Sequence, residues 1–373
     1  MKKQSVTNPK GLRKNNKSNI LWQLYNEGSL SRLQLAKKCK LTTPSITQLI
    51  QELFEENAVL EMGAVQRNAT GRKEVLIDIN YDHFLSISVN IEADNTHISV
   101  ISLNNIKEDM IIKTASLNLQ KNIDVFAENI KTYITKYPQA ISICIGVVGK
   151  IDYINGVVEN SYGIFPNNFA LKTALENEKL ELPIYIVNNV IAQALSLKTK
   201  SNSDFLYIKH SPGVGCAIVV NGEIVGGYQN RAGELGHTIV QPNGKQCKCG
   251  KKGCLETLVS EDALLDDYYQ STKKVIDIQS LYELYKKDNN VTKILDFAIQ
   301  KLALATSNIV VVINPKKVIV TGGLFLNNSL YNSFLHYFEL LGCATKIERI
   351  EDKFRIKTVA EGRYILAKKL FEV

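Results

Sequence analysis

The sequence predicts an α/β protein in which a small helical N-terminal domain precedes a larger domain of strands and helices. Apolar residues follow a helical period up to about residue 54, whereas short β-rich runs alternate with helical stretches from residue 84 onward. A chain of 373 residues with 45% hydrophobic content can bury the cores of two or three domains. We expect one domain over residues 1–80 and a second over residues 81–373.

Two helices are predicted at the start of the chain. Residues 15–27 carry an apolar stripe and end at Gly28, a residue typical of helix C-termini. Ser31 and Gln34 then have the spacing of a capping box, which predicts the start of a second helix. The apolar residues of this second helix are Leu33, Leu35 and Ala36.

A third helix follows after a short break. Thr42 is a suitable N-cap, and Pro44 fits the first turn. The apolar positions of this helix are Ile46, Leu49, Ile50, Leu53 and Phe54. The break between helices two and three has the length of a helix-turn-helix. Two strands, over residues 59–63 and 72–79, would flank a turn over residues 64–71 that forms a basic wing.

The charge of the N-terminal segment indicates a polyanionic partner. Residues 1–80 hold 13 Lys and Arg against 7 Asp and Glu, which accounts for six of the eight net positive charges. Such a segment attracts DNA by counterion release, although a merely solvated terminus has the same composition. In a helix-turn-helix the third helix enters the major groove, where Gln pairs with adenine; ordinary three-helix packing is the alternative. The predicted DNA-contacting residues are Arg32, Thr43, Ser45, Thr47, Gln48, Gln51, Arg67 and Arg72.

The larger domain begins with strands. Residues 85–89 and 97–103 indicate a hairpin, and residues 140–148 a buried strand. Helical stretches are expected over residues 123–137, 262–269 and 294–309.

One imidazole and three thiols lie close together in the sequence, at His237, Cys247, Cys249 and Cys254. Four such donors fill the tetrahedral sphere of a structural Zn²⁺, whereas a catalytic zinc keeps one position for water. Gly250 and Gly253 allow the tight turns that bring the sulfurs together. We therefore predict a zinc loop over residues 237–254, the alternative being a loop of reduced thiols beside a chance histidine.

The apolar runs and the cysteines of the sequence indicate the cellular compartment of the protein. No apolar run approaches the length of a membrane-spanning helix, and the N-terminus lacks an apolar signal core, so we expect a cytoplasmic protein without a membrane partner. The four remaining cysteines are scattered, which argues against a disulfide framework.

The zinc-loop segment also carries a family resemblance. Glu234-Leu-Gly-His237, followed by Cys247-x-Cys-Gly-x-x-Gly-Cys-x-Glu256, resembles the signature of the ROK family of repressors, open reading frames and sugar kinases. Ser31-Arg32 and Gly71-Arg72 resemble the winged helix-turn-helix of ROK repressors. The resemblance implies a winged helix-turn-helix followed by a two-lobed actin-like ATPase domain, whose last helix, about residues 361–371, packs on the first lobe.

The chain departs from the kinases of that family at two of three required places. The first phosphate turn aligns with residues 92–97, which lack both glycines and bring in the charge of Asp94. Asn189 stands where the family has its catalytic aspartate, and an amide cannot act as a general base. Glycines at 213–215 and 321–323 survive in part, and we expect them to have an inherited structural role. The sequence therefore predicts that the protein is not an enzyme.

A sugar-binding role is implied by the resemblance. The family contacts sugar hydroxyls through its zinc-bound histidine and two glutamates, and an asparagine at the base position can still bind a hydroxyl. The predicted sugar-contacting residues are Asn188, Asn189, Glu234, His237 and Glu256. The alternative for the glutamates is support of the zinc loop alone, and Gly163 aligns with a family asparagine.

These expectations combine into a function. We predict a DNA-binding transcriptional regulator, a homodimer or homotetramer that represses carbohydrate-utilisation genes under the control of a sugar or sugar derivative. The alternatives are a sugar kinase with an attached DNA-binding domain, a regulator that has lost its effector, and a zinc sensor.

Overall fold

The computed structural model divides into two units. Unit 1 comprises residues 1–196 with 357–373, and unit 2 comprises residues 197–356. The structure describes residues 9–65, 73–92, 95–114, 119–161, 163–197, 204–210, 212–228, 231–350 and 356–371.

Unit 1 begins with three helices, as predicted. α1 (Pro9–Glu27) starts before the expected residue 15 and ends at Gly28, whose φ is 76°. α2 (Arg32–Cys39) has the predicted capping box: the Ser31 amide donates to Gln34 Oε1 at 2.9 Å, and the Gln34 amide donates to Ser31 Oγ at 3.4 Å. α3 (Thr43–Glu55) is capped by Thr42.

The predicted apolar faces are correct with one exception. The helices bury Ile20, Leu24, Leu35, Ile46, Leu49, Ile50 and Leu53. Leu33, one of the apolar residues named for the second helix, is 61% exposed. α2 is short, and its buried positions are Leu35, Ala36 and Cys39, so Leu33 falls on the opposite side of the helix.

A small antiparallel sheet completes the N-terminal region. Its strand order is β1-β3-β2, and Leu30 lies opposite Ile77. The bounds are β1 (Leu30–Ser31), β2 (Val59–Val65) and β3 (Glu74–Ile79). The turn that we expected to form a wing falls largely outside the described residues.

Unit 1 also contains a five-stranded sheet of order β10-β7-β4-β5-β6. β4, β5 and β6 form an antiparallel meander, of which β6 was not expected, and β7 and β10 add in parallel beside β4. The strands are β4 (Leu85–Ile91), β5 (Asn95–Ile101), β6 (Ile106–Lys113), β7 (Ala140–Val147) and β10 (Ile184–Asn188). β8 (Lys150–Asp152) and β9 (Val157–Asn160) form a separate pair.

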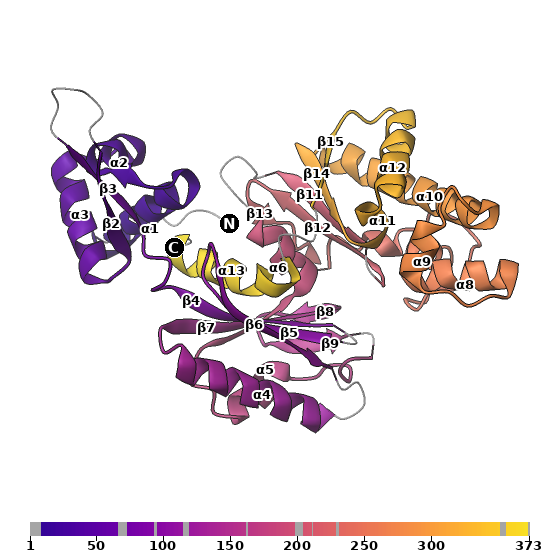
Figure 1. The fold of residues 1–373 in the computed structure, drawn as a ribbon, viewed down its shortest axis with the longest axis horizontal. Helices are drawn as coiled ribbons and strands as arrows, with labels where there is room; N and C mark the ends of the chain where they lie inside the picture. The colour runs from indigo at the N-terminus through magenta and orange to yellow at the C-terminus, as the bar shows by residue number, and fades with distance from the viewer. Residues whose placement is uncertain are drawn as a thin grey trace. The chain divides into compact units, whose positions relative to one another are not determined.

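Helices cover both faces of this sheet (Figure 1). α4 (Leu119–Lys136) and α5 (Leu171–Asn177) lie on one face, where Ile87, Ile145 and Phe126 share a core. The C-terminal α13 (Ile356–Phe371) lies on the other, because the Gly362 amide donates to Ser88 Oγ at 3.1 Å. α6 (Asn189–Ser196) follows β10.

α13 also enters the core of the N-terminal helices. Leu366 and Leu370 are buried in one apolar cluster with Ile20, Leu24 and Ile50. The ring of Phe371 lies 5.1 Å from the rings of both Trp22 and Tyr25, measured between centroids. The three N-terminal helices and the large sheet of unit 1 therefore share one C-terminal helix.

Unit 2 repeats the same sheet plan. Its order is β13-β12-β11-β14-β15, with an antiparallel meander followed by two parallel strands. The strands are β11 (Phe205–His210), β12 (Val214–Val220), β13 (Glu223–Ile224), β14 (Lys317–Thr321) and β15 (Lys346–Arg349). The helices are η2 (Leu235–His237), α7 (Glu256–Val259), α8 (Glu261–Thr272), α9 (Ile278–Glu283), α10 (Asn289–Ile313), α11 (Gly323–Leu326) and α12 (Asn328–Leu340).

α10 is long and apolar enough to span a membrane by length and composition, as the core helix of a soluble domain also can be. Here Leu295, Ile299 and Leu302 are buried in the core of unit 2 against α8 and α12. Its outer side leaves Val311 and Val312 exposed.

Truncation of Leu366 should loosen the N-terminal core. Leu366 is fully buried, so Leu366→Ala leaves a cavity and should lower the free energy of unfolding by about 2–5 kcal/mol. Urea unfolding followed by the fluorescence of Trp22, the single tryptophan, reports on this core. The control Leu340→Ala removes a side chain that is 68% exposed and should change stability by less than about 1 kcal/mol. Equal effects of the two substitutions would contradict this packing.

Candidate metal centre and polar sites

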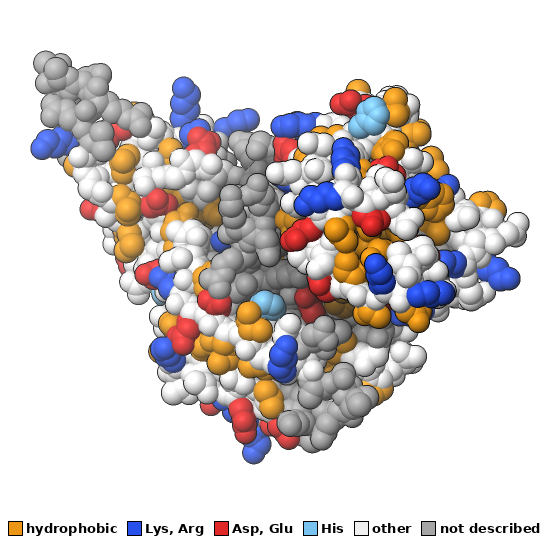
Figure 2. Space-filling model, turned by 45° about the vertical axis from the view of Figure 1, so that its right-hand side comes forward, with side chains coloured by type: hydrophobic (Ala, Val, Ile, Leu, Met, Phe, Trp, Pro, Cys, Tyr) orange, Lys and Arg blue, Asp and Glu red, His pale blue; other side chains and the backbone are white. Residues whose placement is uncertain are grey.

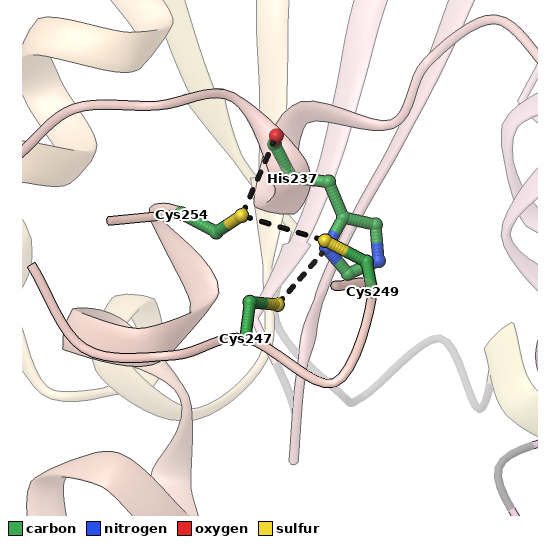
Figure 3. A group of neighbouring side chains, drawn as sticks. All are labelled: His237, Cys247, Cys249 and Cys254. Carbon is green, nitrogen blue, oxygen red and sulfur yellow. Dashed lines mark hydrogen bonds between the residues drawn. The ribbon is translucent and has the colours of Figure 1, made fainter. Parts of the chain in front are cut away.

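Four potential ligands converge in unit 2 (Figure 3). One donor atom each from His237, Cys247, Cys249 and Cys254 lies within 4.8 Å of every other. The sulfurs of Cys249 and Cys254 are 3.6 Å apart, and the sulfur of Cys247 is 3.6 Å from His237 Nδ1. Zn–S bonds of about 2.3 Å in a tetrahedron place neighbouring sulfurs about 3.8 Å apart. This cluster can hold a metal ion.

The loop backbone sets the positions of the sulfurs. The Cys247 amide donates to Lys251 O at 2.8 Å, and the Gly250 amide donates back to Cys247 O at 3.0 Å. Gly250 and Gly253 have φ values of 90° and 74°, as glycine tolerates. A Cβ on Gly253 would lie 1.8 Å from the carbonyl oxygen of Gln241, whereas one on Gly250 would meet nothing within 4 Å.

Lysine and burial shape the electrostatics of the cluster. Lys251 donates to His237 O at 2.7 Å, which brings an ammonium beside the thiols. Three thiolates around a divalent ion leave one net negative charge, which this ammonium can offset. Burial raises the pKa of the Cys254 thiol to about 12, so a bound ion must displace its proton. Sequence reasoning missed Lys251, although its place among the cysteines was a signal.

The two predicted glutamates lie next to the cluster. His237 directs Nδ1 at Cys247, and its Nε2 lies 3.7 Å from Glu234 Oε2. Glu256 is the first residue of α7, and its carboxylate packs closely against two glycines. Its Oε2 would lie 3.0 Å from a Cβ on Gly213 and 3.2 Å from a Cβ on Gly236. Unit 2 thus gathers two carboxylates and one imidazole nitrogen, the kind of groups that bind hydroxyls. Their role stays a prediction.

Asn188 and Asn189 lie at the junction of β10 and α6 in unit 1. Asn188 Oδ1 accepts from the amides of Val190 and Ile191, and its Nδ2 donates to Gly149 O at 2.7 Å. Asn188 therefore caps α6. Asn189 is 1% exposed, and its Nδ2 has no hydrogen-bond partner among the described residues. An unsatisfied buried amide is costly unless another group supplies an acceptor.

Five of the predicted DNA-contacting residues lie exposed on α3: Thr43, Ser45, Thr47, Gln48 and Gln51. Four of them line an open groove of about 770 Å³ together with Pro44, Glu52 and Glu55. Ser45 instead contacts Thr42 Oγ1 at 2.9 Å. Arg32 lies over the ring of Phe54 and 3.5 Å from Glu61. Arg67 and Arg72 lie outside the described residues.

Surface charge is mixed where it is visible. On the face drawn in Figure 2, Lys and Arg side chains are interspersed with Asp and Glu. Some of the basic residues of α1 are paired, since Lys17 Nζ lies 2.8 Å from Glu52 and 2.7 Å from Glu56. Sequence reasoning missed these pairs, because the partners lie on different helices that are far apart in the sequence.

Comparison with known protein families shows which family the chain belongs to. A family model described as "ROK family" matches residues 86–349. The chain belongs to the ROK family. The xylose repressor of Caldicellulosiruptor bescii is 29% identical over 336 residues, which cover 83% of this chain and 83% of that repressor.

Solved ROK structures share the fold. A ROK family transcriptional regulator, a homologue of the Escherichia coli MLC protein, matches 96% of this chain and 97% of its own, with a TM-score of 0.80 and 21% identity. A ROK family glucokinase from Streptomyces griseus, in complex with glucose and AMPPNP, matches 76% of this chain and 99% of its own, with a TM-score of 0.64 and 19% identity. These identities support the fold alone.

The turn that resembles the adenosine side of the ROK kinases packs closely against His210. His210 is fully buried; the Leu324 amide donates to its Nδ1 at 3.3 Å, and its Nε2 lies 2.6 Å from Val259 O. The imidazole is therefore the neutral Nε2–H tautomer, and burial lowers its pKa to about 4. A Cβ on Gly322 would lie 1.8 Å from His210 O, so this glycine permits a close backbone approach.

The two loop glycines should differ in their effect on metal content. Gly253→Ala forces a Cβ into the Gln241 carbonyl and should displace the ligands, so the purified protein should carry less than about half of the wild-type metal per chain. Gly250→Ala adds only the strain of a positive φ, about 1–2 kcal/mol, and should keep its metal. Elemental analysis of both variants measures this, and equal metal content would contradict the loop geometry.

Acid should destabilise unit 2 through His210. Above pH 6.5 the imidazole is neutral in both states; as pH falls toward about 4 the unfolded chain takes up a proton that the folded chain does not. We expect this histidine to cost about 2 kcal/mol of stability between about pH 7 and about pH 5. Urea unfolding by circular dichroism should show a smaller pH slope for His210→Gln and an unchanged slope for the exposed control His336→Gln. A wild-type slope in His210→Gln would overturn the assignment.

Proposed function

We propose that the protein is a sequence-specific DNA-binding transcriptional regulator, a repressor of carbohydrate-utilisation genes controlled by a sugar or sugar derivative. The observation that carries the proposal is the match to the xylose repressor over 83% of both chains. A match of that extent must include at least part of each of the two predicted domains.

Residues 1–80 serve as a winged helix-turn-helix in this proposal, and residues 81–373 as the sugar-binding domain. The order α1, α2, α3, β2, β3 and the exposed polar face of α3 support a DNA-binding role. So does the match of a ROK transcriptional regulator to 96% of the chain, a share that must include most of this N-terminal region. In a dimer, two such helices would read half-sites about 34 Å apart.

The metal in this proposal is a structural Zn²⁺ held by His237, Cys247, Cys249 and Cys254. Three sulfurs and one imidazole nitrogen are the donors that zinc prefers, and four protein ligands leave no open position for catalysis. The ion would fix the loop that presents Glu234 and Glu256. The nitrogen of His237 that faces away from the sulfurs would remain free for a sugar hydroxyl.

The protein is not a kinase in this proposal. Asn189 cannot take a proton from a sugar hydroxyl, and an amide beside the surviving glycine turn is already bonded to His210. A homodimer or homotetramer in the cytoplasm fits a repressor. The exposed Val311 and Val312 of α10 are the kind of apolar surface that oligomers bury.

Fluorescence anisotropy tests the regulator directly. Labelled DNA from upstream of the protein's own gene is titrated at fixed salt, with and without xylose, other pentoses, hexoses, N-acetyl sugars and their phosphates. We expect specific binding that one compound weakens by about 5- to 150-fold, the range of typical allosteric coupling. Glu256→Gln should keep DNA binding and lose the response to that compound, whereas the exposed control Glu283→Gln should keep both.

The outcomes separate the alternatives. Specific binding that no compound changes would favour a regulator without a sugar effector. Sugar-dependent ATP hydrolysis by the wild type would favour the kinase, and Asn189→Asp tests whether the base alone is missing. No preference for this DNA over random sequence would count against the operator assignment.

A further inference from the structure

The outward face of α3 is uniform in chemistry. Ile46, Leu49, Ile50 and Leu53 are buried on its inner side, and the groove along its outer side is lined by Thr43, Thr47, Gln48 and Gln51 with Pro44, Glu52 and Glu55. α3 contains neither Lys nor Arg over its whole length. The face offers amides, hydroxyls and methyl groups, and its only charges are negative.

That chemistry selects among base pairs. Guanine shows two acceptors in the major groove and is read by the cationic donors of Arg or Lys, which this face lacks. A carboxylate could accept from cytosine N4, but Glu52 already accepts from Arg13 and Lys17, and Glu55 accepts from Gln51. Adenine shows an acceptor beside a donor and matches the amide of Gln48 or Gln51. Thr47 Oγ1 already donates to Thr43 O at 2.9 Å, so its methyl group is left for contact with the thymine methyl.

The C-terminal part of α3 is unsuited to phosphate. Glu52 is held by Arg13, whose Nε donates at 3.0 Å, and by Lys17 Nζ at 2.8 Å. Gln51 Nε2 donates to Glu55 Oε1 at 3.3 Å. These ion pairs neutralise Glu52 and also engage Arg13 and Lys17, two of the four basic residues of α1, so neither of these two is available to read guanine. The first turn of α3 carries no acidic residue, and its dipole favours approach of DNA at that end.

We infer that α3 reads a run of A·T pairs, with Gln48 bonding the N6 and N7 edge of an adenine and the threonine methyls contacting thymines. The inference rests on the proposed DNA-binding function and specifies the base composition of each half-site opposite α3. Arg13 and Lys17 position α1 against Glu52 and do not contact bases.

The test is selection of double-stranded DNA from a random library by the full-length protein. We expect inverted repeats whose half-sites carry A·T pairs at the positions where Gln48→Ala relaxes the preference. Replacing the A·T pair at that position by G·C should weaken binding by about 5- to 150-fold, from about 1–3 kcal/mol per bidentate contact. Gln48→Arg should shift that position toward G·C, and Gln270→Ala, an exposed glutamine of α8, should leave the preference unchanged.

A chemical substitution locates the contact atom. 7-Deazaadenine in the selected site removes the N7 acceptor, and it should weaken wild-type binding without a further effect on Gln48→Ala. Selected repeats with G·C at the Gln48-dependent position would overturn the inference and leave the DNA-binding function standing. No enrichment over the starting library would overturn both.

Discussion

The packing of α13 is the constraint on which the arrangement of unit 1 depends. The fully buried Glu361 presses against Gly146 of β7, where a Cβ would lie 2.3 Å from its carboxylate, and its Oε2 accepts from Ser88 Oγ at 3.3 Å. Further along, the same helix inserts Leu366 and Leu370 among the N-terminal helices. One rigid element thus contacts the central strands of the large sheet and the core that supports α3. A shift of that sheet must therefore be accommodated either within α13 or at its contacts with α1.

The metal cluster could be predicted from the sequence because its determinants are local. Four donors between His237 and Cys254 leave few alternatives, and glycine at two turn positions follows from the same tight path. The capping of α2 and α3 was predictable for the same reason, since each cap bonds to a residue three positions away. Side-chain roles beyond the loop were less accessible. Glu256 lies between Gly213 and Gly236, a position that spacing alone does not reveal.

Long-range contacts explain most of what sequence reasoning missed. The family resemblance implied that the last helix packs on the first lobe, but the hydrogen bond between Ser88 and Glu361, which are 273 residues apart, could not be predicted from either segment. Arg13 and Lys17 were counted in the positive charge of the N-terminal segment, yet their carboxylate partners lie on α3 or at its C-terminal end. Asn188 was predicted to contact a sugar, which stays a prediction, but its capping of α6 was not foreseen. Each of these residue types suits more than one structural or binding role, and only the packed structure shows which contacts a given residue makes.

Gly322 and Gly323 resemble part of a nucleotide site, but packing within unit 2 alone can explain why these positions are glycine. Gly322 has a φ of 87°, and any side chain there would collide with the backbone of His210. Gly323 faces His210, Tyr282 and Glu261, each with an atom within 3 Å of where a Cβ would stand. These contacts demand glycine whether or not a nucleotide binds. The close approach of β11 to the start of α11 is enough to require glycine at both positions. The surviving glycines therefore give no support to ATP binding.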